Sequence, residues 1–264
     1  MKNKRQSLFI VLASLFLTNA ILAEIIGIKI FSAEQTLGLS PANIPLFGDF
    51  VLDFNLTAGV VIWPVVFITT DIINEYYGKQ GVRKISYIAA ACISYAFLTI
   101  YLVTLLAPAD FWLDVNGTDA DGNIFNINYA FNTIFRQGLG IIVGSLIAFL
   151  IGQLLDVFVF QKLKKLTGSK MIWLRATGST LISQLVDSFV VLTIAFYLLA
   201  PEGSQWSFAQ LMSVGSINYI YKFAIAIALT PAIYLAHFLI DRYLGKELSA
   251  QMQQEASDSS EGFF

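Results

Sequence analysis

The sequence has little charge and almost none of the side chains that hold metals or activate nucleophiles. Only 13% of its 264 residues are Asp, Glu, Lys or Arg, against roughly 25% in soluble domains. The one cysteine, Cys92, excludes an intrachain disulfide or thiolate cluster, and the one histidine, His237, argues against a His-based zinc or Ser-His-Asp site. A net charge of −2 indicates no surface for nucleic acid. With 56% hydrophobic residues, an integral membrane protein remains.

Long apolar stretches predict membrane-spanning helices. A span needs about 20 apolar residues to cross roughly 30 Å of hydrocarbon. Six stretches meet this length, at residues 8–30, 52–73, 85–107, 131–160, 172–199 and 208–240. Their apolar residues are continuous rather than alternating, which favours helices over strands. The sequence therefore predicts an all-α integral membrane protein built as a six-helix bundle.

Basic residues gather in alternate connections and predict the orientation. Lys and Arg precede the first span and occur at 79–84, 162–175 and 242–246, whereas 31–50, 108–130 and 200–207 contain neither. By the positive-inside rule, both termini are cytoplasmic. The first run is too long for a cleaved signal peptide and lacks its small-residue cleavage site, so we expect it to be retained. Residues 1–246 then form one transmembrane domain, and the polar segment 247–264 a disordered cytoplasmic tail.

Ionisable side chains inside the predicted spans are the candidates for function, because they are costly in a bilayer. Asp71, Asn74 and Glu75 share one helix face. The pairs Gln153/Asp156 and Gln184/Asp187 repeat a three-residue spacing on two other helices. Such faces could line a cavity that holds a planar amide or amidine edge. The alternative is that they only hydrogen-bond across helices and fix the bundle.

Depth along the spans suggests which groups meet. Asp187 and Lys222 fall near the middle of the fifth and sixth spans, at about 1.5 Å per residue, so we predict that they pair. Asn19 lies at a similar depth in the first span. Trp63 and Phe67 stand one turn apart above Asp71 and are candidates to stack on a ring, while Glu75 lies near a span end and could reach the interface.

The outer connection 114–123 is rich in Asp, Asn and Gly and has the look of a calcium loop. It lacks the bidentate Glu that such a loop needs about five residues after its glycine. We therefore interpret it as an Asx-rich turn rather than a metal site.

Four segments together resemble the queuosine precursor transporter family, also called the vitamin uptake transporter family. The first is residues 63–78, W-P-V-V-F-I-T-T-D-I-I-N-E-Y-Y-G, with Arg83 shortly after it. The second is residues 152–160, G-Q-L-L-D-V-F-V-F, and the third is residues 175–188, R-A-T-G-S-T-L-I-S-Q-L-V-D-S. The fourth is residues 218–222, N-Y-I-Y-K. The resemblance covers nearly the whole chain in order. It implies a multi-pass importer of 7-deazaguanines, such as queuine and its nitrile and aminomethyl precursors, in the cell inner membrane. It also implies a distant likeness to the substrate-binding subunits of energy-coupling-factor transporters.

The expected substrate-binding residues combine the polar faces with the family segments. They are Asn19, Trp63, Phe67, Thr70, Asp71, Asn74, Glu75, Gln153, Asp156, Gln184, Asp187 and Lys222. The mechanism expected is alternating access around a polar midplane site. No cofactor and no metal is expected, and the expected partners are the small deazapurine and the lipid bilayer, with a homodimer left open.

Other functions remain open at this point. A vitamin-binding subunit would need a separate coupling ATPase, since no Walker motif occurs in the chain. Another small purine-like compound or a vitamin is an alternative substrate. An intramembrane enzyme is disfavoured because neither G-x-S-x-G nor H-E-x-x-H is present.

Overall fold

A computed structural model describes residues 2–27, 29–45, 51–136, 139–167, 171–198, 200, 203 and 205–258 of the chain. Its helices are α1 (Lys2–Ile26), α2 (Ala33–Thr36), α3 (Trp63–Val103), α4 (Asp110–Val115), α5 (Ile127–Arg136), α6 (Leu139–Thr167), α7 (Ile172–Leu192), α8 (Phe208–Ala228), α9 (Thr230–Leu244) and α10 (Lys246–Asp258). A 3-10 segment, η1 (Ala58–Val61), and a π-helical segment, η2 (Thr193–Leu198), are also present. Four short strands, β1 (Ile30–Ser32), β2 (Ile44–Pro45), β3 (Val51–Leu52) and β4 (Asn55–Thr57), complete the fold.

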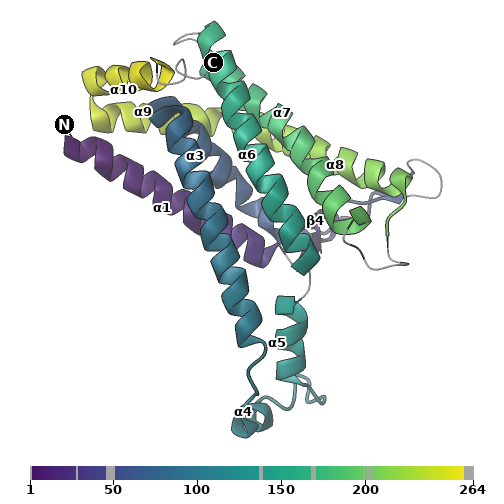
Figure 1. Cartoon of the computed structure of the whole chain (residues 1–264). Coiled ribbons are helices and arrows are strands. Elements are labelled where there is room, and N and C mark those ends of the chain that lie inside the picture. Colours follow the sequence, from purple (N-terminus) through teal and green to yellow (C-terminus); the bar gives the residue numbers. More distant parts are fainter. Residues whose placement is uncertain are drawn as a thin grey trace.

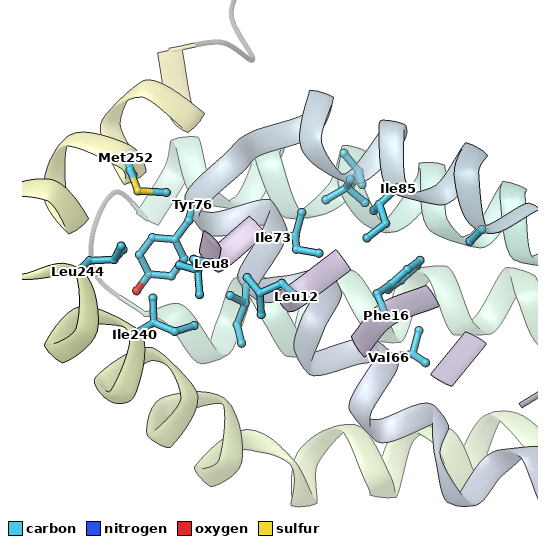
Figure 2. Packing of buried hydrophobic residues seen from close by; sticks show 14 of the residues in the cluster. Leu8, Leu12, Phe16, Val66, Ile73, Tyr76, Ile85, Ile240, Leu244 and Met252 are labelled. Carbon is cyan, nitrogen blue, oxygen red and sulfur yellow. The ribbon is translucent and has the colours of Figure 1, made fainter. Parts of the chain in front are cut away.

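The long helix α3 is bent back on itself at Gly78. This residue has φ 68° and ψ −171°, a conformation that is essentially restricted to glycine. The arms 63–77 and 79–103 then run side by side, as both figures show (Figure 1, Figure 2). They pack closely enough that a Cβ on Gly81 would lie 3.4 Å from Cγ2 of Ile73. Although it is a single element from Trp63 to Val103, α3 therefore has the shape of a hairpin with two helical arms.

Five of the described helices have the length and apolar composition of membrane spans. They are Asn3–Ile26, Trp63–Val103, Gly144–Thr167, Trp173–Leu198 and Phe208–Ala228. Six separate spans are not recovered, because α3 contains parts of both the second and the third predicted stretch. The prediction of an all-α membrane fold is confirmed, and the count of six crossings stays a prediction.

The second predicted span begins eleven residues later than expected. Residues 52–62 are strand, turn and 3-10 segment instead of helix, because β4 pairs antiparallel with β1 and β3 with β2. The Trp63-Pro64 pair lies within the predicted second span but is in fact the start of α3. Proline suits the first turn of a helix, where its missing N–H leaves no hydrogen bond unmade.

The later predicted spans are divided rather than continuous. The stretch 131–160 is split between α5 and α6, with residues 137–138 outside the described part. The stretch 172–199 changes from α7 to the π-helical η2. The stretch 208–240 breaks at Leu229, where α8 ends and α9 begins with Pro231 in its first turn. Pro231 thus interrupts the sixth span as its sequence position predicts.

The apolar core lies between α1, both arms of α3, α9 and α10 (Figure 2). Its most buried large side chains include Phe16 of α1, Ile73 and Ile85 of the two α3 arms, and Met252 of α10, each less than 2% exposed. Helix α10, whose residues from 247 onward were expected to belong to a disordered tail, therefore contributes to the core. The reason is an apolar stripe within its polar sequence, formed by Leu248, Met252 and Ala256 at four-residue spacing. Residues 259–264 lie outside the described part.

One end of the bundle gathers the N-terminus, the α3 hairpin, the end of α6 and α10 (Figure 1). Contacts tie these elements together: Arg5 pairs with Glu255, Lys4 Nζ donates to Tyr243 O at 2.8 Å, and Tyr77 Oη donates to Arg5 O at 2.6 Å. Most of the basic residues predicted to mark the cytoplasmic side lie on these same elements. The opposite end carries α4 and α5, where only Arg136 is basic.

Candidate functional site

Polar side chains run through the bundle between the first arm of α3, α6 and α7. On α3 they follow one face at 67, 70, 71, 74 and 75, because helical neighbours recur every three to four residues. The antiparallel pair α6 and α7 brings Asp156 beside Ser183 and Gly152 beside Asp187. These groups fall into three levels, named here inner, middle and outer, with the inner level beside α10.

The inner level is a buried ion triad. Glu75 of α3 receives a hydrogen bond from Arg175 of α7 at 2.7 Å, and Lys164 of α6 lies 3.5 Å from its other oxygen. All three side chains are at most 6% exposed. Glu75 therefore does not reach the interface, contrary to the sequence-based expectation, because the two cations hold it inside. Burying three charges together is tolerated only when each has a partner.

Further hydrogen bonds join this triad to its surroundings. Gln161 Nε2 donates to Asn74 Oδ1 at 2.6 Å, which links α6 to α3 beside the triad. Lys164 Nζ also donates to the backbone oxygens of Glu75 and Gln253, at 2.9 and 3.3 Å. Helix α10 is thus tied to the charged end of α6.

A second polar group closes the same end. Tyr76 Oη donates to Asp241 Oδ1 at 2.6 Å and lies 3.2 Å from Nδ1 of His237. Ser249 Oγ donates to the same Asp241 oxygen. The one histidine of the chain is therefore a buried structural partner in this network.

The middle level holds two buried carboxyl groups, Asp71 of α3 and Asp156 of α6, which are 2% and 6% exposed. Both lie beside the same turn of α7, since Asp71 shares a cavity with Thr180 and Asp156 is bonded to Ser183. Hydroxyls of α7 lie on the side of Asp156: Ser183 Oγ donates to Oδ1 at 3.4 Å, and Ser179 and Thr180 share the helix face of Ser183. Asp71 Oδ1 is buried without a hydrogen-bond partner. No described Lys or Arg lies within 4 Å of either carboxylate in an ion pair.

A cavity of about 10 Å³ lies beside Asp71, where α3, α7, α8 and α9 meet. Its lining comprises Phe67, Ile68, Asp71, Ala176, Thr177, Thr180, Ala226, Leu229 and Ile233. A space of this size holds about one water molecule or small ion, whereas ligand pockets measure roughly 300–1,000 Å³. The bundle must therefore open before a bicyclic ring can enter. The break at Leu229 borders this cavity and places the first turn of α9 beside it.

Aromatic and amide side chains adjoin the middle level on its outer side. Phe67 is 9% exposed and stacks on Trp63, with ring centroids 5.8 Å apart and planes at 26°. Gln153 and Gln184 are both buried, and Gln153 Oε1 has no hydrogen-bond partner. Thr70 instead donates to the oxygen of Val66 within its own helix. The Gln153 amide therefore keeps an acceptor free inside the bundle.

The outer level contains the predicted pair. Lys222 Nζ of α8 donates to Asp187 Oδ2 of α7 at 2.5 Å, so the expectation that these two groups meet is confirmed. Close by, both oxygens of Glu24 on α1 accept from Ser145 Oγ at 2.8 Å. Asn19 Nδ2 donates to Leu15 O of its own helix at 2.8 Å, and no hydrogen bond links it to another predicted site residue in the described part of the chain.

Sequence reasoning missed the groups that neutralise or surround the predicted acids. Arg175 and Lys164 were assigned to a basic cytoplasmic connection, although they are among the most buried charged side chains. The three α7 hydroxyls, at 179, 180 and 183, lie on the same helix face as Gln184 and Asp187 and would have been found from that periodicity. Glu24, an acid within the first predicted span, is not among the predicted site residues although it bonds to Ser145 at the outer level.

The outer connection forms a turn. Asp119 Oδ1 accepts hydrogen bonds from the backbone N–H groups of Asp121 and Asn123, at 3.0 and 2.8 Å. These bonds lower the pKa of the Asp119 carboxyl. The Asx-turn interpretation is confirmed, and no metal-binding group of three or more acidic, His or Cys side chains occurs in the described part of the chain.

A protein-family match covers the helices α3, α6, α7 and α8, which carry most of the site. The family model described as "Putative vitamin uptake transporter" matches residues 57–236. A protein of Bacillus subtilis named "Probable queuosine precursor transporter" is 31% identical over 71% of this chain and 75% of its own length. The protein of that name in Haemophilus influenzae is 30% identical over 69% and 68%, and the Escherichia coli "Queuosine precursor transporter" is 27% identical over 74% and 80%. No solved structure matches the chain.

Proposed function

The chain belongs to the vitamin uptake transporter family, whose matched relatives are named queuosine precursor transporters, and from this premise we propose that it imports 7-deazaguanine precursors of queuosine. Membership and the apolar helices make it a multi-pass membrane transporter. The proposal adds the substrate class, the site and the mechanism.

The observation that carries the proposal is the set of buried acceptors without partners at the middle level. Asp71 Oδ1 and Gln153 Oε1 have none. An unpaired acceptor inside a membrane protein is costly, and such groups mark substrate pathways. A 7-deazaguanine offers a matching planar edge, on which the N1–H and the 2-amino group can donate to one carboxylate. The neutral ring does not repel an acidic site, and an aminomethyl substituent would add a favourable positive charge.

The surrounding side chains supply the other contacts that a flat bicycle needs. We assign Phe67 and Trp63 to its face, and Gln153, Gln184 and the acids of the middle level to its edges. Trp63 and Phe67 stack on each other in the structure. One of the two rings must therefore move aside, or the substrate must stack on the outer face of Phe67.

Opening and closing at the two ends gives alternating access around this site. The ion triad of Glu75, Arg175 and Lys164 then closes the inner end. We assign six crossings, with the two arms of α3 counted separately, and both termini to the cytoplasm in the inner membrane. The grouping of basic side chains at the α10 end supports this orientation.

A binding assay with the purified protein tests the substrate class. The panel contains queuine, its nitrile and aminomethyl precursors, guanine and several vitamins. We expect at least one deazapurine to bind, and Gln153→Ala together with Gln184→Ala to weaken it by about tenfold for lost buried hydrogen bonds. Asn19→Ala is the matched control, because this amide donates to Leu15 O of its own helix and not to a residue assigned here to the ring. Binding of a vitamin but of no deazapurine would instead favour a vitamin-binding subunit with a separate ATPase.

A further inference from the structure

We propose that Asp71 and Asp156 together hold the monovalent cation, a proton or a sodium ion, whose binding is coupled to that of the substrate. This inference rests on the proposed function and extends it from what is carried to what drives the transport. Its basis is a pair of buried carboxyl groups that lie beside the same turn of α7, Asp71 at a cavity shared with Thr180 and Asp156 bonded to Ser183, and that have no ion-pair partner in the described part of the chain.

Two other acids of the predicted site, Glu75 and Asp187, already have cations. Glu75 is held by Arg175 and Lys164, and Asp187 by Lys222. Those cations are committed and do not reach the middle level. Two neighbouring carboxylates in a low-dielectric interior repel each other unless a positive charge lies with them. A cation must therefore accompany Asp71 and Asp156 whenever both carry their charge.

The site has room and further ligands for one small cation. Asp71 is 2% exposed, its Oδ1 is unpartnered, and it borders the cavity of about 10 Å³. Thr177 and Thr180 of α7 line the same cavity. Carboxylate and hydroxyl oxygens are the hard ligands that small cations prefer. The volume admits a single ion and excludes a substrate ring.

Charged and titratable groups on the neighbouring helices affect how strongly the site binds a cation. On α3, Glu75 faces it from one turn away; Arg175 and Lys164 follow on α7 and α6, both bonded to Glu75. From α9, His237 is turned toward Tyr76. From α1, Glu24 bonds to Ser145 at the outer level. The inner triad carries a net positive charge of one, which favours a single bound cation over two.

The consequence is a simple coupling. With one cation bound, its positive charge offsets the negative charge of one of the two carboxylates. The other carboxylate remains free to accept hydrogen bonds from the N1–H and the 2-amino group of a neutral base. The cation and a neutral substrate therefore assist each other's binding, and this assistance is reciprocal.

The test measures binding of the neutral nitrile precursor to purified protein while sodium or pH is varied. One arm varies sodium at fixed pH, and the other varies pH in sodium-free choline buffer. We expect one of the two to change the affinity by about tenfold, and both Asp71→Asn and Asp156→Asn to remove that dependence. Asp110→Asn, an exposed acid of α4, is the control and should behave as wild type. Thr180→Val should weaken sodium binding but leave a proton dependence intact.

The outcomes separate this inference from the proposed function. If the nitrile binds with the same affinity in all conditions, the coupling is wrong while the substrate class stands. If no deazapurine binds, the substrate class fails, and direct readouts decide the coupling: bound ²²Na⁺ and the infrared band of a protonated carboxyl group, each compared between wild type and Asp71→Asn. Absence of both signals in wild type, or their persistence in the variant, would overturn the cation site.

Discussion

At the scale of single residues, the inner triad shows how charge is kept inside an apolar bundle. Glu75 sits between two cations from different helices, so it joins α3, α6 and α7 at one point. Removing one partner from such a group leaves a buried charge uncompensated, which is more damaging than losing a surface pair. The triad is therefore a structural closure as well as the proposed inner gate.

We expect Arg175→Met to destabilise the protein by about 3–5 kcal/mol, because Glu75 then keeps only the more distant Lys164. Thermal unfolding in detergent measures this loss. Arg5→Met removes the same side chain from the exposed pair with Glu255, whose side chains are 36% and 46% exposed, and should destabilise the protein far less. Equal effects of the two substitutions would show that burial of the triad contributes nothing.

Glu34 of α2 organises the segment between α1 and α3. Its Oε1 accepts from the backbone N–H of Phe54 at 2.8 Å and of Ala42 at 3.3 Å, and Ser32 Oγ donates to Oε2. These bonds, that of Phe54 first, lower the pKa of Glu34 below its ordinary value of 4.5. Because the folded form holds the charged group, this contribution to stability is present above 4.5 and is lost as pH falls through the lowered pKa.

Hydrogen exchange at the Phe54 and Ala42 amides should therefore accelerate in acid, and Glu34→Gln should show the faster exchange already at neutral pH. Glu247→Gln, at an exposed position of α10, serves as the control. Unchanged exchange in Glu34→Gln would mean that the strands β1 and β4 hold the segment without this carboxylate.

The candidate site could be predicted from sequence to the extent that helical periodicity reveals shared faces. It brought together Asp71 with Glu75 and Asp187 with Lys222, because spacing along a helix and depth in the bilayer are both readable from the chain. It could not show that Arg175 and Lys164 point inward, since basic residues beside a connection normally lie in water. That outcome depends on which helices pack together.

At the scale of elements, the structure differs from the sequence-based prediction mainly at the points where helices begin, bend or end. Apolar length predicts where spans lie, but not where the chain turns within them, because strand pairing at 55–57 and the positive φ of Gly78 are tertiary and local backbone effects. The same holds for α10, whose polar composition hides an apolar stripe of three residues. Sequence therefore predicted the class of fold and misplaced the second span and the tail.

The α3 hairpin depends on a conformation that an L-residue with a side chain adopts only under strain. Gly78→Ala should cost about 1–3 kcal/mol for its φ of 68° and ψ of −171°. The measurement is thermal unfolding in detergent. Gly117→Ala is the matched control, since its added Cβ would meet backbone oxygens at an ordinary 3.4 Å. A Gly78 variant as stable as the control would argue against the sharp reversal.

At the scale of the whole molecule, the orientation can be tested by labelling. After Cys92→Ala, single cysteines in place of Lys79 and of Asp121 are exposed to a membrane-impermeant thiol reagent in intact cells. We expect the residue 121 position to react and the residue 79 position to react only after the membrane is opened. Residue 79 follows the bend of α3 and residue 121 lies between α4 and α5, and Figure 1 shows this bend and these two helices at opposite ends of the bundle. Equal labelling of both would contradict the assignment of six crossings.

The central claim is that this chain alone moves a 7-deazaguanine across a membrane, and uptake of the radiolabelled aminomethyl precursor into proteoliposomes tests it most directly. The purified protein should raise the uptake rate well above that of protein-free liposomes without ATP or another protein. Excess unlabelled nitrile precursor should compete with this uptake. Uptake no faster than in protein-free liposomes, for this compound and for queuine, would contradict the claim.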